Sequence, residues 1–143
     1  MGPLSETGNR QRKARCGCGQ LTVSVRGEPL TVYACSCANC QRLSGSAFTY
    51  SAFWAAAEVT VTGTRTAWRF HGDSGRWIET EFCPTCGVTV CFRAEARPEV
   101  IGISVGCFAD PGFPAPERLF WASRGHPWLT FPDTTELQPT QSE

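Results

Sequence analysis

The sequence lacks the features of a membrane, secreted or strongly charged protein. Thirteen lysines and arginines balance thirteen aspartates and glutamates, so no global field attracts nucleic acid or an anionic membrane. No apolar run approaches the roughly 20 residues of a membrane span, and residues 1–15 hold no apolar core for a signal peptide. We therefore expect a cytoplasmic protein with neither membrane nor nucleic acid as a partner.

Helical periodicity is also missing, because no stretch of ten or more residues keeps a period of 3.6. Short alternating or β-branched segments recur between turn residues instead. We expect strands at residues 21–25, 30–34, 48–54, 59–62, 66–70, 77–82, 88–92 and 100–105. This pattern predicts an all-β fold of short antiparallel strands, arranged as a sandwich or a barrel-like pair of sheets.

The 143 residues are enough for one domain with a single core. We expect a disordered polar and basic tail at 1–13, a folded domain at 14–134 and a second disordered tail at 135–143. Five prolines and several aromatic residues follow Asp110 before Asp133. Prolines exclude long regular elements and aromatic rings favour burial, so this C-terminal segment is predicted to be an irregular, ordered coil against the sheet.

Cysteine is abundant, with nine residues, and seven of them fall into three clusters. The clusters are Cys16-x-Cys18, Cys35-Ser-Cys37-Ala-Asn-Cys40 and Cys83-x-x-Cys86. In a reducing compartment, clustered cysteines bind metal or do redox chemistry more often than they form disulfides. A tetrahedral Zn²⁺ takes four sulfurs at about 2.3 Å, so the two pairs together can close one site.

The central cluster supplies only three thiols, which leaves one position on a tetrahedral ion for water or a substrate thiol. That vacancy is typical of a catalytic zinc. His71, His126 or Asp110 could instead provide a fourth ligand and make the site structural. A redox dithiol at Cys83-x-x-Cys86 is a weaker interpretation, because the βαβ pattern that accompanies it is absent. The remaining thiols, Cys91 and Cys107, lie in apolar runs and are predicted to be core residues.

The joint spacing of these motifs resembles a known family. The pattern consists of Gly17-Cys18-Gly19, Cys35-x-Cys-x-x-Cys-x-Arg-x-Ser-Gly-Ser46, Phe82-Cys83-x-x-Cys86-Gly87 and Val105-Gly106-x-Phe108-x-Asp110-Pro111. It is similar to the glutathione-dependent formaldehyde-activating enzyme family, also called the centromere protein V family. The resemblance runs in order from about Cys16 to about Asp133 and places the family's zinc-binding domain within 14–134.

The resemblance implies a zinc-containing β-tent fold of the Mss4-like group and two Zn²⁺ sites. Four cysteines would hold a structural zinc, namely Cys16, Cys18, Cys83 and Cys86. Three would hold a catalytic zinc, namely Cys35, Cys37 and Cys40, and this second site can be partly occupied. The family reaction joins glutathione reversibly to formaldehyde and is classed as a carbon-sulfur lyase. Many relatives carry histidine where this chain has Ser36, so any role of that histidine is not expected here.

These observations define two functional hypotheses. The first is a zinc-dependent carbon-sulfur lyase whose substrates are a small thiol such as glutathione and a small aldehyde such as formaldehyde. Arg42, Ser44 and Gly45 would hold a substrate carboxylate beside the central cluster, and no catalytic residue is predicted beyond the zinc ligands. The second is a non-catalytic, zinc-stabilised module that binds protein or chromatin. The sequence does not determine the oligomeric state.

Overall fold

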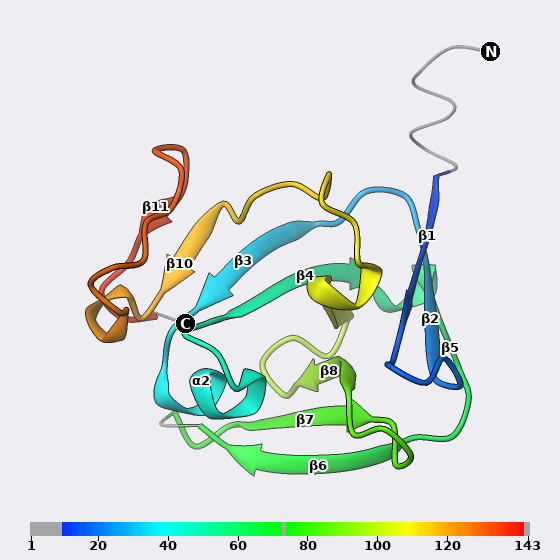
Figure 1. Cartoon of the computed structure of the whole chain (residues 1–143). Coiled ribbons are helices and arrows are strands. Elements are labelled where there is room, and N and C mark those ends of the chain that lie inside the picture. The colour runs from blue at the N-terminus through cyan, green and yellow to red at the C-terminus, as the bar shows by residue number, and fades with distance from the viewer. Residues whose placement is uncertain (1–9, 73, 142–143) are drawn as a thin grey trace, which may run out of the picture.

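The computed structural model describes residues 10–72 and 74–141, and residues 1–9, 73 and 142–143 lie outside the described part. The chain folds into one three-stranded and one eight-stranded β-sheet (Figure 1). The predicted all-β fold is therefore confirmed. Among the described residues, no helix has both the length and the apolar character needed to cross a membrane.

The smaller sheet has the strand order β1-β2-β5 and is antiparallel throughout. Its strands are β1 (Gln11–Arg15), β2 (Thr22–Arg26) and β5 (Val59–Thr62). Alternate residues point to opposite faces, so Ala14, Val23 and Val25 are buried while Lys13 and Arg15 are exposed. The buried face of this sheet packs on the larger one.

The larger sheet has the order β11-β10-β3-β4-β9-β8-β7-β6. Its strands are β3 (Thr31–Cys35), β4 (Thr49–Ala55), β6 (Thr66–His71), β7 (Trp77–Phe82), β8 (Thr89–Ala94), β9 (Val100–Ser104), β10 (Arg118–Phe120) and β11 (Glu136–Leu137). All pairings are antiparallel except those of β10, which runs parallel to both β3 and β11. Each expected strand matches an observed one within about two residues.

The core lies where the two sheets meet. It is built from aliphatic residues of β2, β8 and β9 around Trp54 of β4, including Val23, Val90 and Ile103. The indole N–H of Trp54 donates to the Gly27 carbonyl at 3.1 Å, so this buried polar group is satisfied. The ends of β1 and β7 adjoin this core, and the cysteines of the first candidate metal site lie there.

The helix α2 (Ala38–Ser44) lies between β3 and β4, and the sequence analysis did not predict it. Its seven residues are too few to show a helical period. Cys37 caps its N-terminus by accepting from the Cys40 N–H, and Gly45 ends it in the left-handed conformation at φ 63°. The absence of a helical period in the sequence therefore does not exclude a helix this short.

The segment after Asp110 is ordered and mostly irregular, as predicted. The ring of Phe113 stacks on Phe108 at 5.4 Å and meets Trp54 at 6.4 Å. Three short elements interrupt it, namely the 3-10 helix η3 (Ala122–Arg124) and the strands β10 and β11, and the 3-10 helix η2 (Val105–Phe108) lies just before it. A third 3-10 helix, η1 (Ala56–Glu58), precedes β5.

Both expected domain boundaries differ from the ends of the ordered strands. Strand β1 begins at Gln11 rather than after residue 13, because its backbone pairs with β2 from Gln11 onward. At the other end, Thr135 is buried and its hydroxyl donates to the Pro116 carbonyl at 2.7 Å. Strand β11 then pairs with β10. Of the tails expected at 1–13 and 135–143, residues 1–9 and 142–143 lie outside the described residues.

Candidate metal centres and active site

The four-cysteine cluster, formed by Cys16, Cys18, Cys83 and Cys86, lies where the turns after β1 and β7 meet. Cys16 follows β1 directly, and Cys83 follows β7 directly. Gly19 and Gly87 allow both turns to fold back, with φ of 86° and 81°. The cysteine sulfurs of two segments that are more than sixty residues apart in the sequence thus lie close together in space.

The geometry of this cluster fits a zinc ion. All four sulfurs lie within 4.8 Å of one another, and Cys18 Sγ is 3.7 Å from the sulfurs of both Cys16 and Cys83. A tetrahedral ion with bonds of about 2.3 Å separates its ligand sulfurs by about 3.8 Å. The cluster can therefore accept the ion with little movement.

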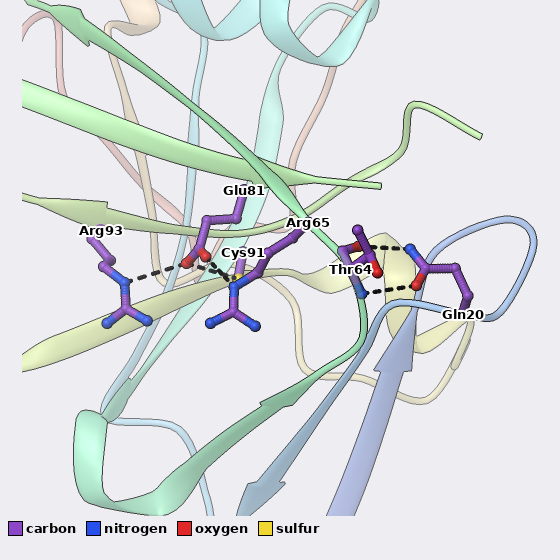
Figure 2. A network of polar contacts seen from close by, with 6 residues as sticks. All are labelled: Gln20, Thr64, Arg65, Glu81, Cys91 and Arg93. Atoms are coloured by element: carbon purple, nitrogen blue, oxygen red, sulfur yellow. Dashed lines mark hydrogen bonds and ion pairs between the residues drawn. The ribbon is translucent and has the colours of Figure 1, made fainter. Parts of the chain in front are cut away.

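Gln20 ties this cluster to a neighbouring strand connection (Figure 2). Its amide nitrogen donates to Cys83 Sγ at 2.9 Å and to the Thr64 carbonyl at 2.7 Å, and its oxygen accepts from the Thr64 N–H at 2.9 Å. The backbones approach so closely here that a Cβ on Gly63 would lie 2.1 Å from the Gln20 carbonyl oxygen. The sequence analysis missed Gln20, since nothing in its local pattern signals a metal-site partner.

Hydrogen bonds to sulfur prepare the cluster for a cation. Burial raises the pKa of Cys83, but donors from Gln20 and from the N–H groups of Cys86 and Thr85 outweigh it and lower that pKa to about 6. Burial also raises the pKa of Cys16, and the Leu21 N–H, 3.3 Å from its sulfur, helps to lower it overall. Because metals bind thiolates rather than thiols, these donors favour metal binding.

A buried carboxylate lies two residues before Cys83 on β7. Glu81 is 6% exposed and pairs with Arg65 at 2.5 Å and Arg93 at 3.2 Å, as Figure 2 shows. The thiol of Cys91 approaches the same carboxylate at 3.7 Å, and burial together with this charge raises the pKa of Cys91 to about 12. Cys91 is thus a protonated core residue, as predicted. Cys107 is partly buried and packs against the core.

The three-cysteine cluster, formed by Cys35, Cys37 and Cys40, lies at the junction of β3 and α2. Cys35 ends β3, Cys37 caps the helix, and Cys40 lies in its first turn. Their sulfurs also lie within 4.8 Å of one another. This separation fits three positions of a tetrahedral ion.

No fourth protein ligand joins this cluster among the described residues. His126 contacts Gln41 at 3.2 Å instead, and the Asp110 carboxylate accepts from the Gly112 N–H at 2.9 Å. His71 ends β6 and lies outside the cluster. Among the described residues, the cluster therefore consists of the three cysteines alone.

The thiols of the three-cysteine cluster differ in pKa. Hydrogen bonds from Cys35 and Cys40 lower the pKa of Cys37 to about 2, whereas the same network raises the pKa of Cys35. The Cys37 sulfur also accepts a hydrogen bond from the Cys40 N–H of helix α2 at 3.3 Å. These hydrogen bonds therefore favour the thiolate form at Cys37 over that at Cys35.

Ser36 is a structural residue. Its side chain is fully buried, and its hydroxyl donates to the Ala47 carbonyl at 3.0 Å. Its own carbonyl accepts from the Gln41 amide at 2.7 Å, and that amide also donates to the Arg124 carbonyl at 3.2 Å. Ser36 therefore fixes the loop between Cys35 and α2.

A large cavity of about 1580 Å³ opens over the three-cysteine cluster, and the cluster lines it. Five arginines and one glutamate are the charged residues among the described part of its lining, namely Arg42, Arg76, Arg97, Arg118, Arg124 and Glu117. Aromatic rings line the space between them, with Tyr33 flanked by Phe53 at 5.3 Å and Phe120 at 5.6 Å. The arginines of this lining favour a ligand that carries negative charge, and the aromatic rings favour apolar contact with it.

The structure places the three predicted substrate-contact residues differently. Arg42 and Ser44 line the cavity together with the cysteines, whereas Gly45 does not. Arg42 is exposed and forms no ion pair with any residue in the described ranges. The Ser44 hydroxyl donates to the Cys40 carbonyl at 2.9 Å, and Gly45 is the helix cap. Arg42 is therefore the strongest of the three candidates.

The fold and the two cysteine clusters together define a small all-β protein with two candidate zinc centres, one closed and one open to a cavity. The model of the family described as "Glutathione-dependent formaldehyde-activating enzyme" matches residues 11–124. The chain therefore belongs to this family, and its fold is the family's Mss4-like β fold.

One solved structure supports the fold independently. A Rhodobacter sphaeroides protein has a TM-score of 0.54 and 24% identity to this chain, and the match covers 71% of this chain and 90% of that one. No curated protein matches the sequence. The structural likeness extends over most of the described domain and says nothing about the substrate.

Proposed function

We propose that the protein is a carbon-sulfur lyase that adds a small thiol such as glutathione to an aldehyde such as formaldehyde, and reverses that addition. One observation carries this proposal: three clustered cysteines lack a fourth protein partner in the described residues and line a cavity rich in arginine. The family description names glutathione and formaldehyde. We assign Cys35, Cys37 and Cys40 as ligands of the catalytic zinc.

The four-cysteine cluster would hold a structural zinc through Cys16, Cys18, Cys83 and Cys86. The three-cysteine cluster is suited to bind a zinc ion that lowers the pKa of a substrate thiol and makes it nucleophilic near neutral pH. The chain's own residues then orient the thiol. The cavity arginines attract its carboxylates, since a guanidinium can form two parallel hydrogen bonds to a carboxylate.

Arg42 would hold a glutathione carboxylate beside the cluster. It projects from the helix that carries Cys37 and Cys40 at its N-terminal end, so a bound carboxylate would lie a short distance from the reacting sulfur. The other cavity arginines have partners: Arg97 pairs with Glu99 at 3.3 Å and Arg118 with Glu136 at 3.5 Å. We expect this reaction in the cytoplasm, where thiols remain reduced.

Exchange of formaldehyde with glutathione, followed by NMR, tests the proposal. The zinc-loaded protein should accelerate adduct formation, and Arg42→Ala should raise the KM for glutathione roughly tenfold while zinc content stays constant. Arg26→Ala is the matched control, because Arg26 is exposed on β2 of the smaller sheet. If the wild-type protein leaves the exchange rate at its spontaneous value, the assigned substrates are incorrect.

The alternative of a non-catalytic binding module makes a different prediction. It requires a protein group to close the second cation site, and in the described residues no histidine, aspartate or glutamate joins the three cysteines. X-ray absorption of the zinc-loaded protein should therefore change when glutathione is added, because a fourth sulfur becomes a ligand. An unchanged spectrum would favour the module.

A further inference from the structure

Four polar side chains form a row across the floor of the cavity. Arg118 of β10, Tyr33 of β3, Ser51 of β4 and Ser104 of β9 are register partners in neighbouring strands. Paired residues point to the same face of a sheet, and all four line the cavity. The larger sheet thus offers a line of hydrogen-bonding groups on its cavity face.

This polar row lies next to the three-cysteine cluster. Tyr33 precedes Cys35 by two residues in β3, so both side chains point into the cavity, roughly 7 Å apart along the strand. Phe120 is the register partner of Cys35, and its ring meets Tyr33 edge to face at 5.6 Å. Phe53 contacts the other side of Tyr33 at 5.3 Å. The phenol ring is therefore held in place beside the cluster.

The hydroxyl of Tyr33 lies on the cavity face of the sheet, beside Ser51. Ser51 is buried, 4% exposed, and is the register partner of Tyr33 on β4, so the two side chains lie on the same face. Cys35, Cys37 and Cys40 line the same cavity as Tyr33. A phenol hydroxyl donates one hydrogen bond and can accept others, so the Tyr33 O–H can donate to a ligand in the cavity.

We propose that Tyr33 is a catalytic residue whose hydroxyl donates a hydrogen bond to the aldehyde oxygen while the thiol adds. This inference rests on the proposed function. The thiolate sulfur forms the carbon–sulfur bond, the carbonyl π pair moves to oxygen, and that oxygen takes a proton from water. Tyr33 remains a phenol throughout and stabilises the charge that develops on oxygen. In the reverse direction it donates to the same oxygen as the carbon–sulfur bond breaks.

The chain provides a matched control for this role in its second tyrosine. Tyr50 is also partly buried, but its hydroxyl donates to the Pro114 carbonyl and its ring meets Phe113 at 6.1 Å. Removing that hydroxyl leaves the polar row intact. Tyr33→Phe and Tyr50→Phe therefore each remove one hydroxyl with little change in ring packing.

Two measurements on the zinc-loaded protein test the assignment. Tyr33→Phe should lower kcat for adduct formation on the order of 100-fold with the KM for glutathione unchanged, as expected for loss of one donor to a developing oxyanion. Tyr50→Phe should leave kcat within about twofold. Calorimetry should show that wild type binds glutathione premixed with formaldehyde about five- to tenfold tighter than glutathione alone, and that Tyr33→Phe loses this gain.

The outcomes separate the two proposals. If wild type does not accelerate adduct formation, the proposed function fails, and the affinity comparison still tests the contact between Tyr33 and oxygen. If Tyr33→Phe keeps both its kcat and its affinity gain, the assignment of Tyr33 is overturned. A wild-type protein that shows no affinity gain from formaldehyde overturns it as well. An equal loss of kcat in Tyr33→Phe and Tyr50→Phe would indicate an effect on packing and would also overturn the catalytic role of Tyr33.

Discussion

At the scale of single residues, Gln20 connects the four-cysteine cluster to the rest of the molecule through one amide group. It donates to Cys83 Sγ. Figure 2 shows the two hydrogen bonds that it forms with the Thr64 backbone. Partners of this kind orient metal ligands and keep them in the ionised form. A change at Gln20 should therefore affect metal retention before it affects activity.

Gln20→Ala should weaken zinc binding at the four-cysteine cluster about 10- to 100-fold, because Cys83 loses its side-chain donor. It should also lower the free energy of unfolding by about 1–3 kcal/mol, since the Thr64 groups lose their partners. Competition with a chromophoric chelator and denaturant unfolding measure the two effects. Gln11→Ala, at an exposed position of β1, is the control and should change neither quantity.

The sequence predicted the cysteine clusters but not the residues around them. Ligand spacing is local, so Cys35, Cys37 and Cys40 could be grouped from six consecutive residues. Gln20 and Tyr33 act through neighbours that the fold brings together, and Ser51 meets Tyr33 only because β3 and β4 pair in one register. Such contacts depend on strand register, which a single sequence does not determine.

At the scale of elements, β9 shows how a strand shapes the cavity floor. Gly102 pairs with both Phe53 and Phe92, and a Cβ built on it would lie 2.2 Å from the Phe92 ring. The Phe92 ring therefore occupies the space that a side chain at position 102 would need. This glycine is required by packing and not by its backbone conformation.

Gly102→Ala should lower the free energy of unfolding by about 1–3 kcal/mol, because the methyl group overlaps the Phe92 ring. Thermal unfolding measures the effect. Adding Phe92→Leu should restore part of the loss, since the smaller side chain makes room. Gly106→Ala is the control: nothing lies within 4 Å of a Cβ there, so its stability should stay within about 0.5 kcal/mol of wild type. No rescue by Phe92→Leu would mean that the overlap is not the cause.

The strands were predictable from their period of two and the turn residues between them, whereas α2 and the parallel pairs were not. Helix α2 has seven residues and depends on Cys37 and Gly45 as caps, so no periodic signal exists. Strand β10 has only three residues and pairs with β3, more than eighty positions earlier. Short segments pair through tertiary context, which local propensity does not describe.

At the scale of the whole molecule, the two cysteine clusters should differ in their effect on stability. The four-cysteine cluster joins segments 65 residues apart, as in the contact between Cys18 and Cys83, and has two fully buried members. The three-cysteine cluster lies within one short segment and opens to the cavity. Structural zinc can supply on the order of 10 kcal/mol of apparent folding free energy.

Chelation should therefore proceed in two stages. The first equivalent of zinc should leave the three-cysteine cluster with loss of activity and an unchanged β-sheet circular dichroism spectrum. Removal of the second equivalent should unfold the chain, because β1 and β7 lose their connection. Metal analysis and circular dichroism along one chelator titration measure both stages. Simultaneous loss of both ions would show that the clusters are not independent.

The distance along the chain between the halves of the four-cysteine cluster has a consequence for biosynthesis. Synthesis runs from the N-terminus, so the Cys35, Cys37 and Cys40 set is complete once its helix leaves the ribosome. Cys16 and Cys18 must wait until Cys86 has emerged. The newly made polypeptide therefore completes its three-cysteine cluster well before its four-cysteine cluster.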